Sequence, residues 1–209
     1  MTLLRSQGPF APLRVDGVVF DSVMTLPARL PVYDFTRGAK PSGMKRHQYG
    51  IGRYDEHRPN MYLGSQFSAG QRDIHMGIDI GAPAHSEVRA FYSGRIFKLG
   101  DNAAPYDYGP TIITEHHWLS QTIYALHGHL SRSSLRPWCE GDLFESGAVL
   151  GYLGQAEENG GWPPHLHFQL SLAQPDKHDL PGVVSKADRP WARTAFPDPR
   201  LVLGPLYGE

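Results

Sequence analysis

The chain lacks the features that mark several large classes of protein. Cys139 is the only cysteine among 209 residues, so neither an intrachain disulfide nor a cysteine-rich zinc knuckle can form. Lysine and arginine number 20 against 21 aspartates and glutamates, so bulk charge gives no attraction to nucleic acid, and we expect no nucleic-acid partner. No apolar run approaches the roughly 20 residues that cross a bilayer, so we expect no membrane span.

Glycine and proline are abundant, at 23 and 18 residues, which disfavours a helix bundle and favours short strands joined by turns. Ser93-Gly94 is a candidate hairpin turn between the first two of six predicted strands. We therefore expect an all-β fold, a compact antiparallel sheet or sandwich that forms a groove. The predicted strands are Glu87–Tyr92, Arg95–Leu99, Thr111–Glu115, Gln121–Leu126, Ala148–Leu153 and Leu166–Leu172.

The composition changes twice along the chain and predicts three parts. Residues 1–60 form an irregular N-terminal extension of short apolar stretches separated by proline and glycine. This extension lacks the apolar run of a secretory signal peptide, so we expect a cytoplasmic location. Residues 61–172 form the β domain, and the Pro-rich residues 173–209 form a tail that packs on it.

The first of three segments rich in histidine and aspartate is His75-Met-Gly-Ile-Asp79. If it is extended, His75 and Asp79 point to the same face, because side chains alternate along a strand. An imidazole and a carboxylate that converge form half of a site for zinc, which takes nitrogen and oxygen ligands. A surface histidine near a turn gives the same spacing, so this motif needs support from the others.

The second segment ends a predicted strand and reads His127-Gly128-His129-Leu-Ser131. His127 and His129 share a face if the chain is extended there. Gly128 between them permits close approach of a substrate backbone. A turn with a capping histidine would give the same pattern.

The third segment, Asn159–Leu170, is the most specific. Its Gly-Gly and Pro-Pro loop leads into a strand in which His165 and His167 share one face and apolar residues occupy the other. Two histidines on an otherwise apolar strand are costly to bury without a metal or a charged network as partner. We expect Trp162, which precedes this strand, to line a substrate groove.

Together the segments predict a metal centre. His75, Asp79 and either His165 or His167 make a set of three ligands from distant parts of the chain. Three protein ligands leave one tetrahedral zinc position for water, which is the pattern of catalytic sites. The remaining histidines are then candidates for the base and the transition-state stabiliser.

These motifs, in this order, resemble the M23 (LytM/lysostaphin-type) zinc metallopeptidase family over about residues 70–172. The resemblance implies one zinc ion at the floor of a β-sheet groove, held by His75, Asp79 and His167. It also implies that His129 and His165 are the catalytic pair, which polarises the water and stabilises the tetrahedral intermediate. The implied reaction is hydrolysis of a peptide or amide bond, typically in peptidoglycan.

Some details narrow the resemblance. Many family members carry an aromatic residue where this chain has His127, which places a further imidazole near the predicted groove. Asp107-Tyr-Gly-Pro110, Asn159–His165 and Pro197-Asp-Pro199 are similar to a branch whose domains are fused to kinase-like and class III aminotransferase modules. That branch favours a small cytosolic peptide or amide as substrate.

Two alternatives stay open at this point. Degenerate LytM-like domains are non-catalytic modules that bind a peptide or partner, but they lose ligands that this chain keeps. In a latent enzyme, residues 1–60 would plug the groove and supply a fourth ligand. The sequence predicts neither cleavage specificity nor oligomeric state.

Overall fold

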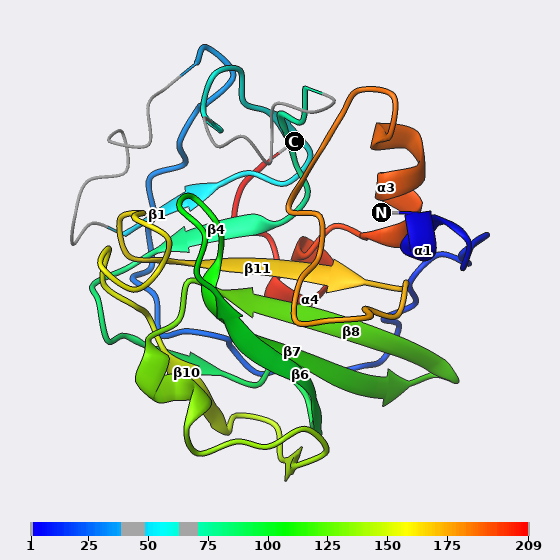
Figure 1. The fold of residues 1–209 in the computed structure, drawn as a ribbon. Coiled ribbons are helices and arrows are strands. Elements are labelled where there is room, and N and C mark those ends of the chain that lie inside the picture. Colours follow the sequence, from blue (N-terminus) through cyan, green and yellow to red (C-terminus); the bar gives the residue numbers. More distant parts are fainter. Residues whose placement is uncertain (1, 39–48, 63–70, 209) are drawn as a thin grey trace.

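The computed structural model describes residues 2–38, 49–62 and 71–208. A seven-stranded antiparallel sheet dominates the fold (Figure 1). The order of strands across it is β1 (Gly50–Gly52), β4 (Ile78–Gly81), β11 (His165–Ser171), β8 (Gln121–Gly128), β7 (Gly109–Trp118), β6 (Gly94–Asn102) and β9 (Leu143–Phe144).

Two smaller antiparallel sheets accompany it. One pairs β5 (Glu87–Arg89) with β10 (Val149–Tyr152), and the other has the order β12 (Val183–Val184), β3 (Ile74–His75) and β2 (Glu56–His57). The helices are short: α1 (Thr2–Arg5), the 3-10 helix η2 (Arg132–Leu135), α3 (Arg189–Ala195) and α4 (Arg200–Leu203). The predicted all-β fold is confirmed, apart from these short helices. Within the described ranges, no helix has the length and apolar character to cross a bilayer.

Strand β11 lies inside the main sheet, between β4 and β8, and both of its faces are buried. Leu166, Phe168 and Leu170 are fully buried in the larger apolar core. His165 and His167 alternate with them and therefore belong to the opposite face. The second apolar cluster includes Ile74, Met76, Tyr108, Ile113, Leu126 and Phe196.

The predicted hairpin at Ser93-Gly94 is wrong. Arg89 pairs with Val149 of β10, and Arg95 of β6 pairs with Glu115 of β7. The chain between β5 and β6 turns into the core because Phe91 is fully buried there. The ring of Phe91 packs edge-on against Phe168 with a centroid separation of 5.6 Å, and this apolar packing replaces a tight turn.

Both terminal parts contribute strands beside the histidine-rich segments. In the N-terminal extension, β1 is the edge strand of the main sheet and pairs Gly52 with Asp79. In the C-terminal tail, β12 pairs Val183 with His75. The extension and the tail are therefore hydrogen-bonded to the strands that carry His75 and Asp79.

Candidate metal centre

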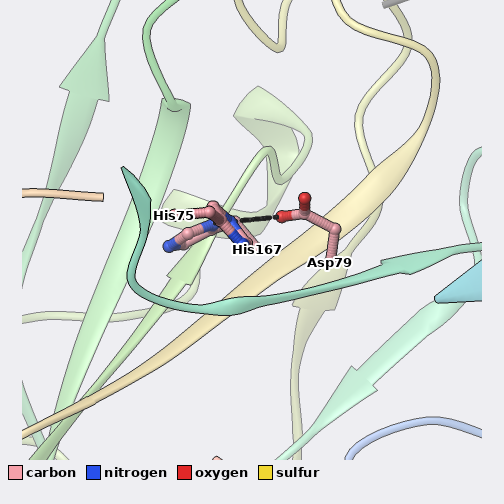
Figure 2. A group of neighbouring side chains, drawn as sticks. All are labelled: His75, Asp79 and His167. Carbon is pink, nitrogen blue, oxygen red and sulfur yellow. Dashed lines mark hydrogen bonds and ion pairs between the residues drawn. The ribbon is translucent and has the colours of Figure 1, made fainter. Parts of the chain in front are cut away.

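Three polar side chains from separate strands converge beside the main sheet (Figure 2). His167 of β11 lies opposite Asp79 of β4 in the ladder, and His75 ends β3. The Nε2 atom of His75 is 3.0 Å from Nδ1 of His167, and each nitrogen is 3.1 Å from Oδ1 of Asp79. His75 and Asp79 converge as predicted, although the chain changes from one sheet to another between them.

The hydrogen bonds of the two imidazoles fix which nitrogen can bind a cation. Nδ1 of His75 is 2.9 Å from the backbone oxygen of Arg53, which only accepts, so this nitrogen donates and Nε2 keeps its lone pair. Nε2 of His167 donates to Oε1 of Gln169 at 3.1 Å, which leaves the lone pair on Nδ1. Two lone pairs and the Asp79 carboxylate therefore face one another, an arrangement that a cation stabilises.

The geometry and chemistry of this group fit zinc. Tetrahedral zinc with bonds of about 2.0–2.1 Å holds its ligand atoms about 3.3 Å apart, close to the 3.0–3.1 Å observed here. Two nitrogens and one carboxylate oxygen suit zinc better than calcium or magnesium, which prefer oxygen alone. Among the described residues, no fourth His, Cys, Asp or Glu joins the group.

The charges match those of metal ligands. Burial, followed by the charge of Arg58, lowers the pKa of His75 to about 4, so the imidazole is neutral at pH 7. Burial acts to raise the pKa of Asp79, but the charge of Arg58, whose Nη1 donates to Oδ2, holds it well below its usual range. His75 and Asp79 therefore have the protonation states that zinc requires.

His129 and His165 lie next to this group. His129 follows β8 and His165 begins β11, and their ring centroids are 4.2 Å apart. Nδ1 of His129 donates to the backbone oxygen of Asn159 at 2.9 Å, and Nδ1 of His165 donates to that of Pro163 at 2.7 Å. Each Nε2 is left as a proton acceptor, and that of His165 is 3.9 Å from Oδ1 of Asp79. Burial lowers the pKa of both imidazoles.

His127 does not share a face with His129, so that prediction is wrong. His129 has a backbone φ of +62°, which ends the regular alternation after Gly128. The His127 ring instead packs against Phe168 in the larger core, with centroids 5.3 Å apart. Its Nδ1 is 3.3 Å from the backbone oxygen of Ile112, and its Nε2 is buried with no hydrogen-bond partner among the described residues.

Trp162 lies beside His129, which follows β8, and His165, which begins β11. Its ring centroid is 6.3 Å from that of His129 and 6.4 Å from that of His165. The exposed Tyr106 packs edge-on against the indole, with centroids 6.0 Å apart. Trp162 is itself buried, in a small apolar cluster with Phe35 and Met61, and a role in a substrate groove stays a prediction.

Two further residues that contact the group are not expected from the sequence. The Tyr108 ring lies 5.0 Å from that of His167, and its hydroxyl donates to the backbone oxygen of Leu180 at 3.1 Å. Gly182 provides the space for this hydroxyl, because a Cβ there would overlap it. The buried Arg58 contacts Asp79, and no local pattern in the extension singles it out.

Comparison with known proteins agrees with the motifs. The model of peptidase family M23 matches residues 73–179. The catalytic domain of the prophage-encoded M23 protein EnpA from Enterococcus faecalis is 20% identical, with a TM-score of 0.44 over 68% of this chain and 95% of that one. The catalytic domain of the antimicrobial peptidase lysostaphin from Staphylococcus simulans is also 20% identical, with a TM-score of 0.46 over 69% and 92%. No curated protein matches the sequence.

Proposed function

Since the chain belongs to peptidase family M23, we propose that it is a zinc metallopeptidase that hydrolyses a peptide or amide bond. The observation that carries the proposal is the convergence of Nε2 of His75, Oδ1 of Asp79 and Nδ1 of His167 within 4.8 Å of one another. Both imidazoles donate their N–H groups away from this point, so the atoms that face each other are all electron-pair donors. These three residues would hold one zinc ion per chain.

Zinc bound there would act as a Lewis acid. It would polarise the scissile carbonyl and lower the pKa of a water molecule toward 7. The protein contributes the proton transfers through His129 and His165. Each has its Nδ1–H bound to a backbone carbonyl, so only Nε2 is free to take the proton of the attacking water. The imidazole that takes this proton then carries an Nε2–H that can be given to the departing amine.

We propose a peptide substrate of the peptidoglycan type or a small peptide or amide, with Trp162 as one wall of the groove. The centroid of the indole ring lies 6.3 Å from that of His129 and 6.4 Å from that of His165, so a substrate held against the indole would reach the catalytic pair. Aromatic side chains commonly supply such apolar contact while a few polar groups set the orientation.

The test combines metal content with turnover. We expect about one zinc per chain after dialysis, and hydrolysis of at least one member of a panel of glycine-rich peptides, peptidoglycan and small amides. A chelator should abolish turnover and added zinc should restore it. A folded protein that binds no zinc, or turnover that a chelator leaves unchanged, would contradict the proposal.

A latent enzyme is the second candidate, and one observation favours it. The five polar side chains of the site, His75, Asp79, His129, His165 and His167, are each at most 5% exposed, so this conformation admits little solvent to them. A latent form would bind zinc but hydrolyse no substrate of the panel until the N-terminal extension, residues 1–60, is displaced from the groove. A non-catalytic peptide-binding module would instead bind peptide without needing the metal.

A further inference from the structure

We propose that Arg58 is a positioning residue of the metal centre, which directs one oxygen of Asp79 toward the ion by holding the other. The inference rests on the proposed function, because it concerns the same metal site. Arg58 precedes residues 73–179, the part of the chain that the family model matches, so the metal site would include a residue outside that part.

The two oxygens of Asp79 have separate partners. Nη1 of Arg58 donates to Oδ2 at 2.6 Å, whereas Oδ1 is the atom 3.1 Å from the nitrogens of His75 and His167. The Arg58 and Asp79 side chains are only 2% and 5% exposed, so water does not compete for this bond. With Oδ2 held, Asp79 presents a single oxygen to the ion.

Arg58 is itself held from several directions. Its Nε donates to Oε2 of Glu56 at 2.9 Å, and its Nη1 and Nη2 donate to the hydroxyl of Tyr62 and the backbone oxygen of Arg53. The guanidinium carbon lies 4.9 Å from the centroid of the Phe35 ring. A cation fixed in this way imposes its own position on the carboxylate that it binds.

The same segment also orients a second ligand. The backbone oxygen of Arg53, which accepts from Arg58, also accepts the Nδ1–H of His75 at 2.9 Å. Residues 53–58 therefore contact both His75 and Asp79. Such outer contacts fix the tautomer and direction of metal ligands, and their loss typically weakens metal binding about 10- to 100-fold.

Gly52 supplies the space for the ion pair. It lies opposite Asp79 in the ladder between β1 and β4. A Cβ at this position would be 2.7 Å from Nη2 of Arg58 and 2.9 Å from Oδ2 of Asp79. The glycine lets the backbone of the extension approach the pair closely, and a side chain there would force the two groups apart.

The experiment measures metal affinity by competition with a chromophoric chelator, together with the d–d absorption of the cobalt-substituted protein. We expect Arg58→Met to weaken zinc binding about 10- to 100-fold and to change the cobalt spectrum, because Asp79 is then free to turn or to offer both oxygens. Arg58→Lys keeps the charge but not the planar set of N–H donors of the guanidinium, so it should give an intermediate loss of zinc affinity. Neither readout depends on turnover.

The control for loss of an arginine–carboxylate pair is Arg95→Met; the side chain of Arg95 is 48% exposed, whereas that of Arg58 is 2% exposed. Arg95 also donates to a buried carboxylate in the main sheet, that of Glu115, at 2.8 and 3.0 Å, but it contacts no residue of the metal centre. We expect wild-type zinc affinity and an unchanged cobalt spectrum for this variant. A loss equal to that of Arg58→Met would mean that the effect is general destabilisation, and would overturn the inference.

Two further outcomes separate this inference from the proposed function. If the wild-type protein binds no metal, the proposed function fails and the inference fails with it. If the wild type binds zinc and Arg58→Met binds it equally or more tightly, only the inference fails. Should Arg58→Met not fold, Gly52→Ala keeps every charge, and unchanged zinc affinity in that variant would also overturn the inference.

Discussion

The imidazole rings of His129 and His165 lie against each other, with centroids 4.2 Å apart and planes inclined by 36°. Burial is the main cause of the lowered pKa of both, and for His129 the nearby His165 lowers it further. A charge on one ring disfavours a charge on the other, so the pair accepts one proton more readily than two. That property suits a pair that passes a single proton from water to a leaving group.

We expect His129→Ala to keep zinc and to lose about 10²- to 10⁴-fold in rate, the usual contribution of a general base. The reason is that His129 lies outside the group formed by His75, Asp79 and His167. Zinc content by elemental analysis and turnover on the most active substrate of the panel would check this. A zinc-free His129→Ala protein would overturn the division between ligands and catalytic pair.

We expect His167→Ala and Asp79→Ala to lose zinc and activity together. His167 provides one of the three converging atoms, and its loss leaves two ligands. Asp79→Ala also removes one of the two carboxylates that the buried Arg58 binds, the other being Glu56, so it should destabilise the fold by about 1–3 kcal/mol. Circular dichroism would show whether each variant is folded before its zinc is measured. Full zinc content in folded His167→Ala would contradict the ligand assignment.

Gly77→Ala tests whether the close approach of the chain to His167 matters. A Cβ at this position would lie 2.6 Å from Cε1 and Nε2 of His167 and 2.8 Å from the backbone oxygen of Phe168. Because the strand cannot easily move, we expect about 1–3 kcal/mol of destabilisation and weaker zinc binding. Gly208→Ala, where a Cβ meets nothing within 4 Å, is the control. Equal stability and zinc affinity in both variants would show that His167 adapts.

The proximity of His75, Asp79 and His167 could be predicted because each stands in a short motif whose order along the chain is informative. Alternation along β11 also placed His165 and His167 on one face correctly. The same rule failed for His127, because one residue with positive φ ends the alternation before His129. Such a backbone change has no reliable signature in a non-glycine residue.

Contacts between distant segments were less accessible to sequence reasoning. Arg58, which follows β2, reaches Asp79 of β4 only once the two segments have folded against each other. The strand Gly50–Gly52 has too few side chains to show a pattern of alternation. The local sequence at Ser93-Gly94 favours a hairpin. Burial of Phe91 depends on the whole core and outweighs this local preference.

We expect acid to destabilise the protein, because two histidines are buried on the face of the main sheet opposite the metal centre. His116 and His127 are both fully buried, and burial is the main cause that lowers their pKa values, to about 4 and about 3. In the unfolded chain an imidazole has a pKa of about 6.5. Below that pH the unfolded state binds more protons than the folded state, so stability is complete above about pH 6.5 and falls as the pH drops toward 4.

His127→Leu should remove part of this acid sensitivity, because leucine has a similar volume and does not titrate. At pH 7.5 we expect a change in the free energy of unfolding within about 1 kcal/mol, since the weak bond of Nδ1 to Ile112 is lost but the unpartnered Nε2 is removed as well. Between pH 7.5 and pH 5 the wild type should lose about 2 kcal/mol more stability than the variant. Urea denaturation at both pH values, followed by tryptophan fluorescence, measures the difference. Equal losses in the two proteins would mean that His127 becomes protonated in the folded state without cost, and would contradict its placement in a closed apolar core.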